Sequence, residues 1–299
     1  MFRNLRLLFF VLILAAGFGF LVFQWRIYHQ IPKNYEWNAV EGWLKEQADF
    51  NDLILFEPEW LAGFAQDFGR FKPYSVVNRN EILKKNYPPA SKLWLISMFK
   101  DSSLAPKIKK AGFLPEESHN IYSVWLTPTS VPSKNVTYRF IDHLPEAKVF
   151  IDKGDGKIVK AEWQNQEWVF SDNPVDWNRV SVRAEPFGRR IHRCIWFHPL
   201  EAGVKTLQYD KVPLGKRIEL GGGMADSGLQ TPPGAPVYLF IQIDGREVGN
   251  FEFHDIDRKF HHLLDTSSLS GNEGRVSFQV QTSDQSARHF CFSAWSLEE

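Results

Sequence analysis

From residue 136 to the C-terminus the sequence repeats one pattern, in which short runs of alternating apolar and polar residues are separated by turn residues. The runs are residues 136–140, 149–151, 158–163, 166–170, 180–184, 190–197, 204–209, 216–220, 237–243, 246–253, 275–281 and 288–295. Asp155-Gly156 and Asp244-Gly245 are Asp-Gly pairs between such runs, and this pair favours the tight turn of a β-hairpin. Many short strands without helices predict a jelly-roll-like β-sandwich over about 180–299, with a small β-hairpin subdomain at 136–177.

Residues 36–127 follow a different pattern, in which the helical and the strand period alternate. Asn38 and Glu41 have the spacing of a capping box at the start of a helix. The predicted strands are residues 53–56, 93–98 and 121–126. Strands separated by helices predict a small α/β domain with a parallel sheet, and the proline- and serine-rich residues 128–133 are the expected linker to the β-rich region at 136–299. The whole chain is therefore expected to be an α+β multidomain protein.

The first 30 residues contain an uncharged stretch of 19 residues, Leu7 to Trp25. A helix of this length is sufficient to cross a hydrocarbon core of about 30 Å. Arg3 and Arg6 precede it, which predicts a single transmembrane helix with the bulk of the chain on the periplasmic, extracytoplasmic side. A cleaved signal peptide is the alternative, because residues 15–17 are small, but the apolar run continues to Phe23 and favours an uncleaved anchor.

Lysine plus arginine balances aspartate plus glutamate at 35 each, so the chain has no net positive charge that would attract nucleic acid. The chain has only two cysteines, Cys194 and Cys291, each within a strand-like run. In an exported protein they are expected either to form a disulfide or to remain as two buried thiols. Without further ligands they do not define a zinc site.

Three tryptophans, Trp163, Trp168 and Trp177, lie close together in a segment rich in aspartate and asparagine. Planar aromatic rings beside amides and carboxylates suit the face and the hydroxyl groups of a sugar. The alternative is that the rings form cross-strand pairs that hold a small sheet together.

Residues 254–262 contain five groups able to bind a metal ion, but their spacing matches neither a helical zinc motif nor an EF-hand loop. A polar loop between strands is therefore expected, with no metal. Asp226, His254 and Asp257 are instead candidate ligand-binding residues in the loops of the sandwich. The glycines at 221–223 indicate a bulge or a close crossing of strands rather than a phosphate loop.

The β-rich region resembles galactose-binding-like and related carbohydrate-binding modules, and the exported soluble tails of bacterial glycosyltransferases of the protein mannosyltransferase type. The segments that carry the resemblance are His192–Pro199, Val212–Gly215, Gly221–Met224, Pro236–Gly245 and Arg288–Phe292, with Asn51–Phe56 and Lys92–Ser97 in the α/β part. Those transferases keep their catalytic residues in a many-helix membrane domain, which this chain lacks. The resemblance therefore implies no catalytic residue and no cofactor.

Three functions are compatible with these observations. The first is a single-pass, envelope-facing accessory protein, not an enzyme, whose β-sandwich binds glycan or a glycan-synthesis partner. The second is a non-catalytic structural subunit of a membrane protein complex. The third is a glycosyltransferase-related enzyme with an unrecognised site.

Overall fold

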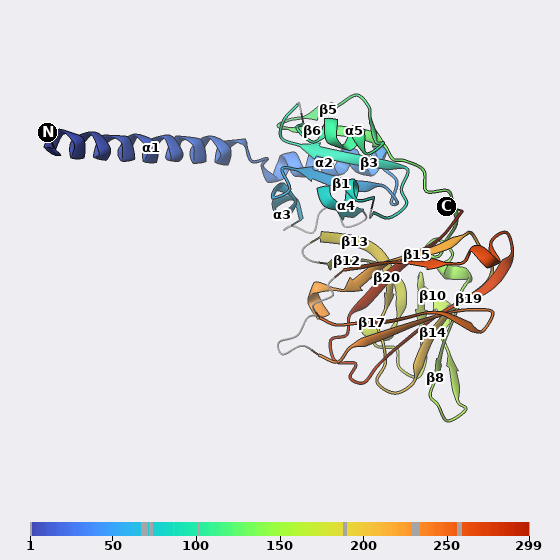
Figure 1. Ribbon diagram of the computed structural model, residues 1–299. Helices are drawn as coiled ribbons and strands as arrows, with labels where there is room; N and C mark the ends of the chain where they lie inside the picture. Colours follow the sequence, from blue (N-terminus) through green and yellow to red (C-terminus); the bar gives the residue numbers. More distant parts are fainter. Residues whose placement is uncertain are drawn as a thin grey trace.

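The computed structural model describes residues 2–66, 71, 74–85, 87–100, 102–187, 190–228, 234–255 and 259–298, without the side chains of residues 2–9, 26–28, 30 and 64–66. Helix α1 (Phe2–Gln30) extends away from the rest of the chain (Figure 1). Within the described part of the chain, no helix is both long enough and apolar enough to cross a membrane. The anchor expected at residues 1–30 is thus not confirmed, and the side chains of its first apolar residues, 7–9, lie outside the described ones.

A six-stranded sheet with four short helices around it forms the N-terminal domain. Its elements are α2 (Asn34–Gln47), β1 (Leu53–Glu57), α3 (Leu61–Gln66), β2 (Ser75–Val77), α4 (Arg79–Leu83), β3 (Lys92–Ser97), α5 (Ala105–Lys110), β4 (Leu114–Pro115), β5 (His119–Ile121) and β6 (Val124–Ser130). The strand order is β2-β1-β3-β6-β4, and β5 also pairs with β6.

This sheet is mixed, not parallel as expected. Strands β2, β1 and β3 are parallel, but β6 runs antiparallel to β3. The cause is a tight turn at Tyr122, whose φ of 55° reverses the chain between β5 and β6, inside the expected third strand. Strand β6 continues to Ser130 and so takes up the first part of the expected linker.

Both faces of this sheet are buried. Trp37, Val40 and Leu44 recur at helical spacing on α2 and cover one face, while the helices α4 and α5 cover the other. A strand that is buried on both sides is apolar at successive positions, as the sequence of β1 is from Leu53 to Phe56.

The remaining strands form a β-sandwich of two sheets (Figure 1). The first sheet contains β10 (Glu162–Gln164), β11 (Glu167–Val169), β12 (Val180–Phe187), β13 (Arg190–Phe197), β20 (Phe290–Leu297), β15 (Arg217–Met224) and β18 (Phe260–Asp265) in that order, and β7 (Val136–Arg139) also pairs with β20. The second contains β17 (Arg246–Phe253), β16 (Val237–Ile243), β19 (Glu273–Thr282), β14 (Val204–Pro213), β8 (Lys148–Asp152) and β9 (Ile158–Lys160). Four short 3-10 helices, η1 (Leu144–Glu146), η2 (Asp176–Asn178), η3 (Asp226–Gly228) and η4 (Ser267–Leu269), lie in the connections.

One large apolar core lies between the two sheets, as the alternating pattern requires. Both Asp-Gly turns join antiparallel strands, β8 to β9 and β16 to β17. Residues 136–177, expected as a separate subdomain, instead add strands to both sheets, so the sandwich begins at β7. A Cβ on Gly222 would lie 2.3 Å from the carbonyl oxygen of Cys291, so the glycine run marks a close crossing of strands.

Candidate functional site

An open cleft of about 620 Å³ lies where the sandwich meets the N-terminal domain. We call it the Trp163 cleft. The hairpin β10–β11, strand β12 and the loop around Asp142 line it on the sandwich side, and Phe50 lines it from the N-terminal domain. Its lining includes Phe50, Asp142, Trp163, Asn165, Gln166 and Arg183.

The aromatic surface of the cleft comes from Trp163 on β10, which pairs across the hairpin with Trp168 on β11. The ring centres of the two indoles are 5.4 Å apart, and their planes are inclined by 60°. Trp163 is half-buried and packs against the core, which holds its ring in place while part of it lines the cleft.

The hairpin turn supplies the first polar groups. Asn165 and Gln166 have φ values of 52° and 66°, so both occupy the left-handed region that a two-residue hairpin turn needs. Both side chains are exposed and line the cleft. Two carboxamides, each a donor and an acceptor, therefore lie close to the indole of Trp163.

Charged groups form the other polar part of the lining. Asp142 lies 3.6 Å from Arg193, whose Nη1 also donates to Asn51 Oδ1 at 3.0 Å. Glu167 accepts from Arg179 Nη1 at 2.9 Å. The carboxylates of Asp142 and Glu167 and the guanidinium of Arg193 are therefore held in position by protein partners.

Strand β12 contributes backbone groups. Its neighbour β11 pairs only with Val180 and Ser181, and no described strand pairs with β12 on that side from Val182 onward. Residues 181–184 line the cleft. Peptide groups along this edge are available to a ligand, because no sheet partner occupies them.

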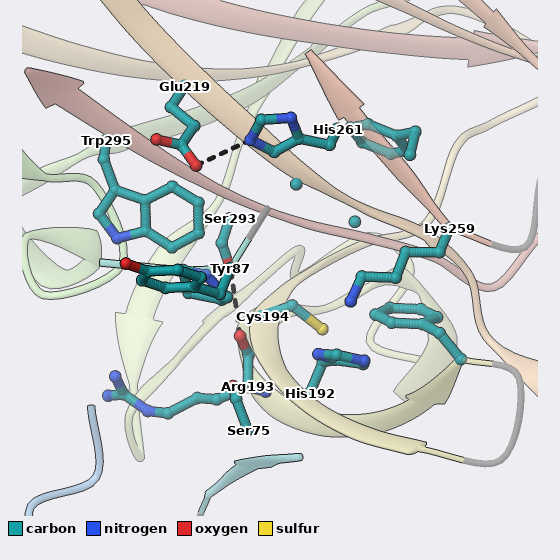
Figure 2. Close-up of a pocket in the computed structure, with 15 residues that line it drawn as sticks. Ser75, Tyr87, His192, Arg193, Cys194, Glu219, Lys259, His261, Ser293 and Trp295 are labelled. Atoms are coloured by element: carbon teal, nitrogen blue, oxygen red, sulfur yellow. Dashed lines mark hydrogen bonds and ion pairs between the residues drawn. The ribbon is translucent and has the colours of Figure 1, made fainter. Parts of the chain in front are cut away.

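A second cavity, of about 40 Å³, lies deeper in the junction between the domains (Figure 2). Its buried Glu219 accepts hydrogen bonds from Lys134 Nζ at 2.8 Å and from His261 Nε2 at 2.8 Å. Burial opposes the charge of Glu219, but these partners outweigh it and lower its pKa. Nε2 of the buried His192 has no hydrogen-bond partner among the described atoms.

Burial lowers the pKa of His192 well below its ordinary value, so the ring is neutral. A cavity of this size has space for only a few water molecules. We therefore regard it as part of the domain junction. Arg193 lines both spaces and connects the junction to the Trp163 cleft.

Trp163 and Trp168 form the cross-strand pair that was the alternative reading of the sequence, and the three tryptophans line different parts of the structure. Trp168 donates from Nε1 to the carbonyl oxygen of Leu144 at 2.9 Å and lines a different groove. Trp177 lies in η2, with its ring 5.0 Å from His198, beside the cluster that contains the Cys194–Cys291 disulfide. Of these three tryptophans, Trp163 alone lines the cleft that we named after it.

Of the loop residues expected to bind ligand, Asp226 and His254 do not line the cleft. Asp226 lies in η3, and His254 follows β17 with its Nε2 3.2 Å from Glu252. Asp257 lies outside the described residues. The expected polar loop at 254–262 ends in strand β18, where His261 binds Glu219. Among the residues whose positions are described, no group of three or more histidine, cysteine, aspartate or glutamate side chains could hold a metal ion.

Among the residues that line the cleft, the sequence singled out only Trp163. Asn165 and Gln166 could have been found, because two residues between two tryptophan-bearing strands predict a tight hairpin turn. Phe50, Asp142 and Arg183 come from distant parts of the chain and meet only through the tertiary fold.

No family model matches the chain, and no curated protein matches it. Among solved structures, CBM51 from Clostridium perfringens GH95 in complex with methyl-galactose is 13% identical, with 49% of this chain and 87% of that chain covered and a TM-score of 0.29. CBM27-1 from Caldicellulosiruptor saccharolyticus in complex with mannohexaose is 13% identical, with 50% and 94% covered and a TM-score of 0.29. The M60 catalytic domain with CBM51-1 and CBM51-2 from Clostridium perfringens ZmpB is 13% identical; this chain spans only 20% of its length, with 66% of this chain covered and a TM-score of 0.33.

These neighbours contain carbohydrate-binding modules. At such identities and TM-scores the likeness assigns no function to this chain. The comparisons do not support the resemblance to mannosyltransferase tails.

Proposed function

We propose that this protein binds glycans in the Trp163 cleft, without a catalytic step. The observation that carries the proposal is a half-buried indole in an open cleft whose lining also holds carboxamide, carboxylate and guanidinium groups. A sugar ring offers an apolar face to an aromatic ring and hydroxyl groups to polar side chains around it. The volume of about 620 Å³ lies within the usual range for sites that bind small ligands.

Phe50 extends the proposed site into the N-terminal domain. Its ring is 60% exposed, and the neighbouring Asn51 accepts a hydrogen bond from Arg193 of the sandwich. An exposed aromatic ring next to an interdomain hydrogen bond is a second candidate contact for a sugar face. The proposed site therefore needs both domains.

Calorimetric titration of the full chain with neutral and acidic oligosaccharides of three to six sugars tests the proposal. Replacing Trp163 with Ala should weaken binding about tenfold or more, which corresponds to roughly 1.4 kcal/mol of lost contact. Trp60, which is exposed and does not line the cleft, provides the matched control as Trp60→Ala.

Because Trp163 also packs against the core, its replacement can weaken binding through loss of folding. Two further variants test the cleft without changing the core. Asn165→Gly and Gln166→Gly remove the carboxamides, and glycine accepts the left-handed backbone at both positions. We expect weaker binding with an unchanged unfolding midpoint. Absence of binding across the panel, or full binding by all three cleft variants, would overturn the proposal.

We also propose that the sandwich works outside the cytoplasm. The support is the disulfide between Cys194 and Cys291, because such bonds form and persist mainly in oxidising compartments. Alkylation of whole cells under denaturing, non-reducing conditions should leave both cysteines unmodified. Modification of both in freshly lysed cells would contradict the proposed location.

A further inference from the structure

One cation at the β12 edge of the Trp163 cleft is held rigidly by the protein, on the face of the sheet opposite to Trp163. Arg183 on β12 stacks its guanidinium over the ring of Trp196, 4.4 Å from the ring centre. Its Nε donates to Ser181 Oγ at 3.1 Å, and its Nη2 donates to the carbonyl oxygen of Asp176 at 3.0 Å. Three separate contacts therefore fix the plane of the guanidinium before any ligand binds.

Arg183 has no carboxylate within 4.0 Å among the described residues, although Glu167, Glu185 and Asp176 lie close enough to favour its charge. Glu167 and Asp176 are both paired with Arg179, at 2.9 Å and 3.1 Å. Asp142 is paired with Arg193. These carboxylates therefore form ion pairs with Arg179 and Arg193, whereas Arg183 forms no ion pair with the described residues.

The environment of Arg183 makes an incoming anion favourable. Burial of the guanidinium removes part of its hydration and lowers its pKa, but arginine remains protonated in proteins. Nη1 makes no hydrogen bond to the described residues, so its two N–H groups are available. A partly desolvated guanidinium with free donors binds a carboxylate more strongly than a fully hydrated one does.

We infer that the cleft selects acidic glycans, with Arg183 binding the carboxylate of a uronic-acid-type sugar. This inference rests on the proposed function, since it assigns a ligand class to the same site. Because the two residues lie on opposite faces of the sheet, Trp163 would contact one sugar of the chain, and Arg183 would bind the carboxylate of another sugar that passes the β12 edge.

The test compares each acidic oligosaccharide with its own neutral methyl ester, so that size and stereochemistry are matched. Oligogalacturonate and oligoglucuronate serve as probes beside the neutral glycans of the first titration. At low salt the wild-type protein should bind at least one acid about tenfold more tightly than its ester, and added NaCl should reduce this difference.

Arg183→Gln should lower the affinity for the acid to that for the ester while the affinity for the ester stays the same. Arg183→Lys keeps the charge but loses the planar fork, and should retain only part of the preference. Arg246→Gln, which removes an exposed arginine in a hairpin outside the cleft, is the control and should change nothing. The unfolding midpoint of each variant shows whether the stack on Trp196 is needed for folding.

The outcomes separate the inference from the proposed function. Equal binding of acid and ester, binding of neutral glycans alone, or an unchanged preference in Arg183→Gln would overturn the inference and leave glycan binding intact. Failure of every glycan, charged or neutral, to bind would overturn the proposed function itself.

Discussion

The indole of Trp163 lies directly across the β10–β11 hairpin from that of Trp168, with ring centres 5.4 Å apart. Both rings are half-buried and pack against the same core, but they differ in their hydrogen bonds and in the groove that each lines. Trp168 uses its Nε1 to donate to the carbonyl oxygen of Leu144, whereas Trp163 lines the open cleft. We therefore expect their substitutions to have opposite signatures, one on stability and the other on binding.

Replacing Trp168 with Ala should lower the free energy of unfolding by about 2 to 4 kcal/mol, since packing against the core and a hydrogen bond are both lost. Chemical denaturation measures this change. Trp60→Ala, outside this core, should shift the free energy by less. A Trp168→Ala protein that unfolds like wild type would show that this ring has no structural role.

Lys205 makes stability depend on pH. Its side chain is fully buried, with Nζ donating to the carbonyl oxygen of Asn178 at 3.1 Å, and burial lowers its pKa to about 7. Between pH 7 and about 10.5 the unfolded chain holds a proton on Lys205 that the folded chain does not, so stability should rise with pH across this window.

Lys205→Met should flatten this rise and make the protein more stable near pH 7, because no buried ammonium remains. Denaturation midpoints from pH 6 to 10 measure both effects. Lys216→Met changes an exposed lysine and should leave the profile as in wild type. If the stability of Lys205→Met depended on pH as that of the wild type does, Lys205 would not be the group that causes the rise.

Glu219 binds His261 within the sandwich and Lys134 between the domains, and Lys134 Nζ also donates to the carbonyl oxygen of Tyr87 in the N-terminal domain. Glu219→Gln should cost about 3 to 5 kcal/mol, because the largely buried ammonium of Lys134 then lacks its carboxylate. The same partners lower the pKa of Glu219, so its contribution should be lost as the pH falls through that lowered pKa. Denaturation from pH 3 to 7 tests this, and no difference from wild type at neutral pH would count against it.

The disulfide joins residues 97 positions apart, across neighbouring strands β13 and β20. Removing it by the double substitution Cys194→Ala and Cys291→Ala should lower the free energy of unfolding by about 2 to 5 kcal/mol. Thermal melts of the variant and of the oxidised wild type measure the difference. Equal midpoints would mean that the bond does not contribute to stability.

Local pattern determined much of this protein. The alternation of apolar and polar residues predicts most strands of the sandwich, and the Asp-Gly pairs locate two of its hairpins, because period and turn chemistry act over a few residues. The helix α2 follows from its apolar spacing, and Trp163 could be selected as a candidate because its neighbours in the chain are polar.

Tertiary structure decided the rest. The turn at Tyr122 makes the N-terminal sheet mixed. Strand β18 begins at Phe260, within the polar residues 254–262 that predicted a loop, because it pairs with the distant strand β15. The cleft is assembled from Phe50, Asp142, Trp163 and Arg183, which no spacing rule connects. Trp163 and Trp168 pack against the same core but line different grooves, because different segments, far apart in the chain, lie beside each ring.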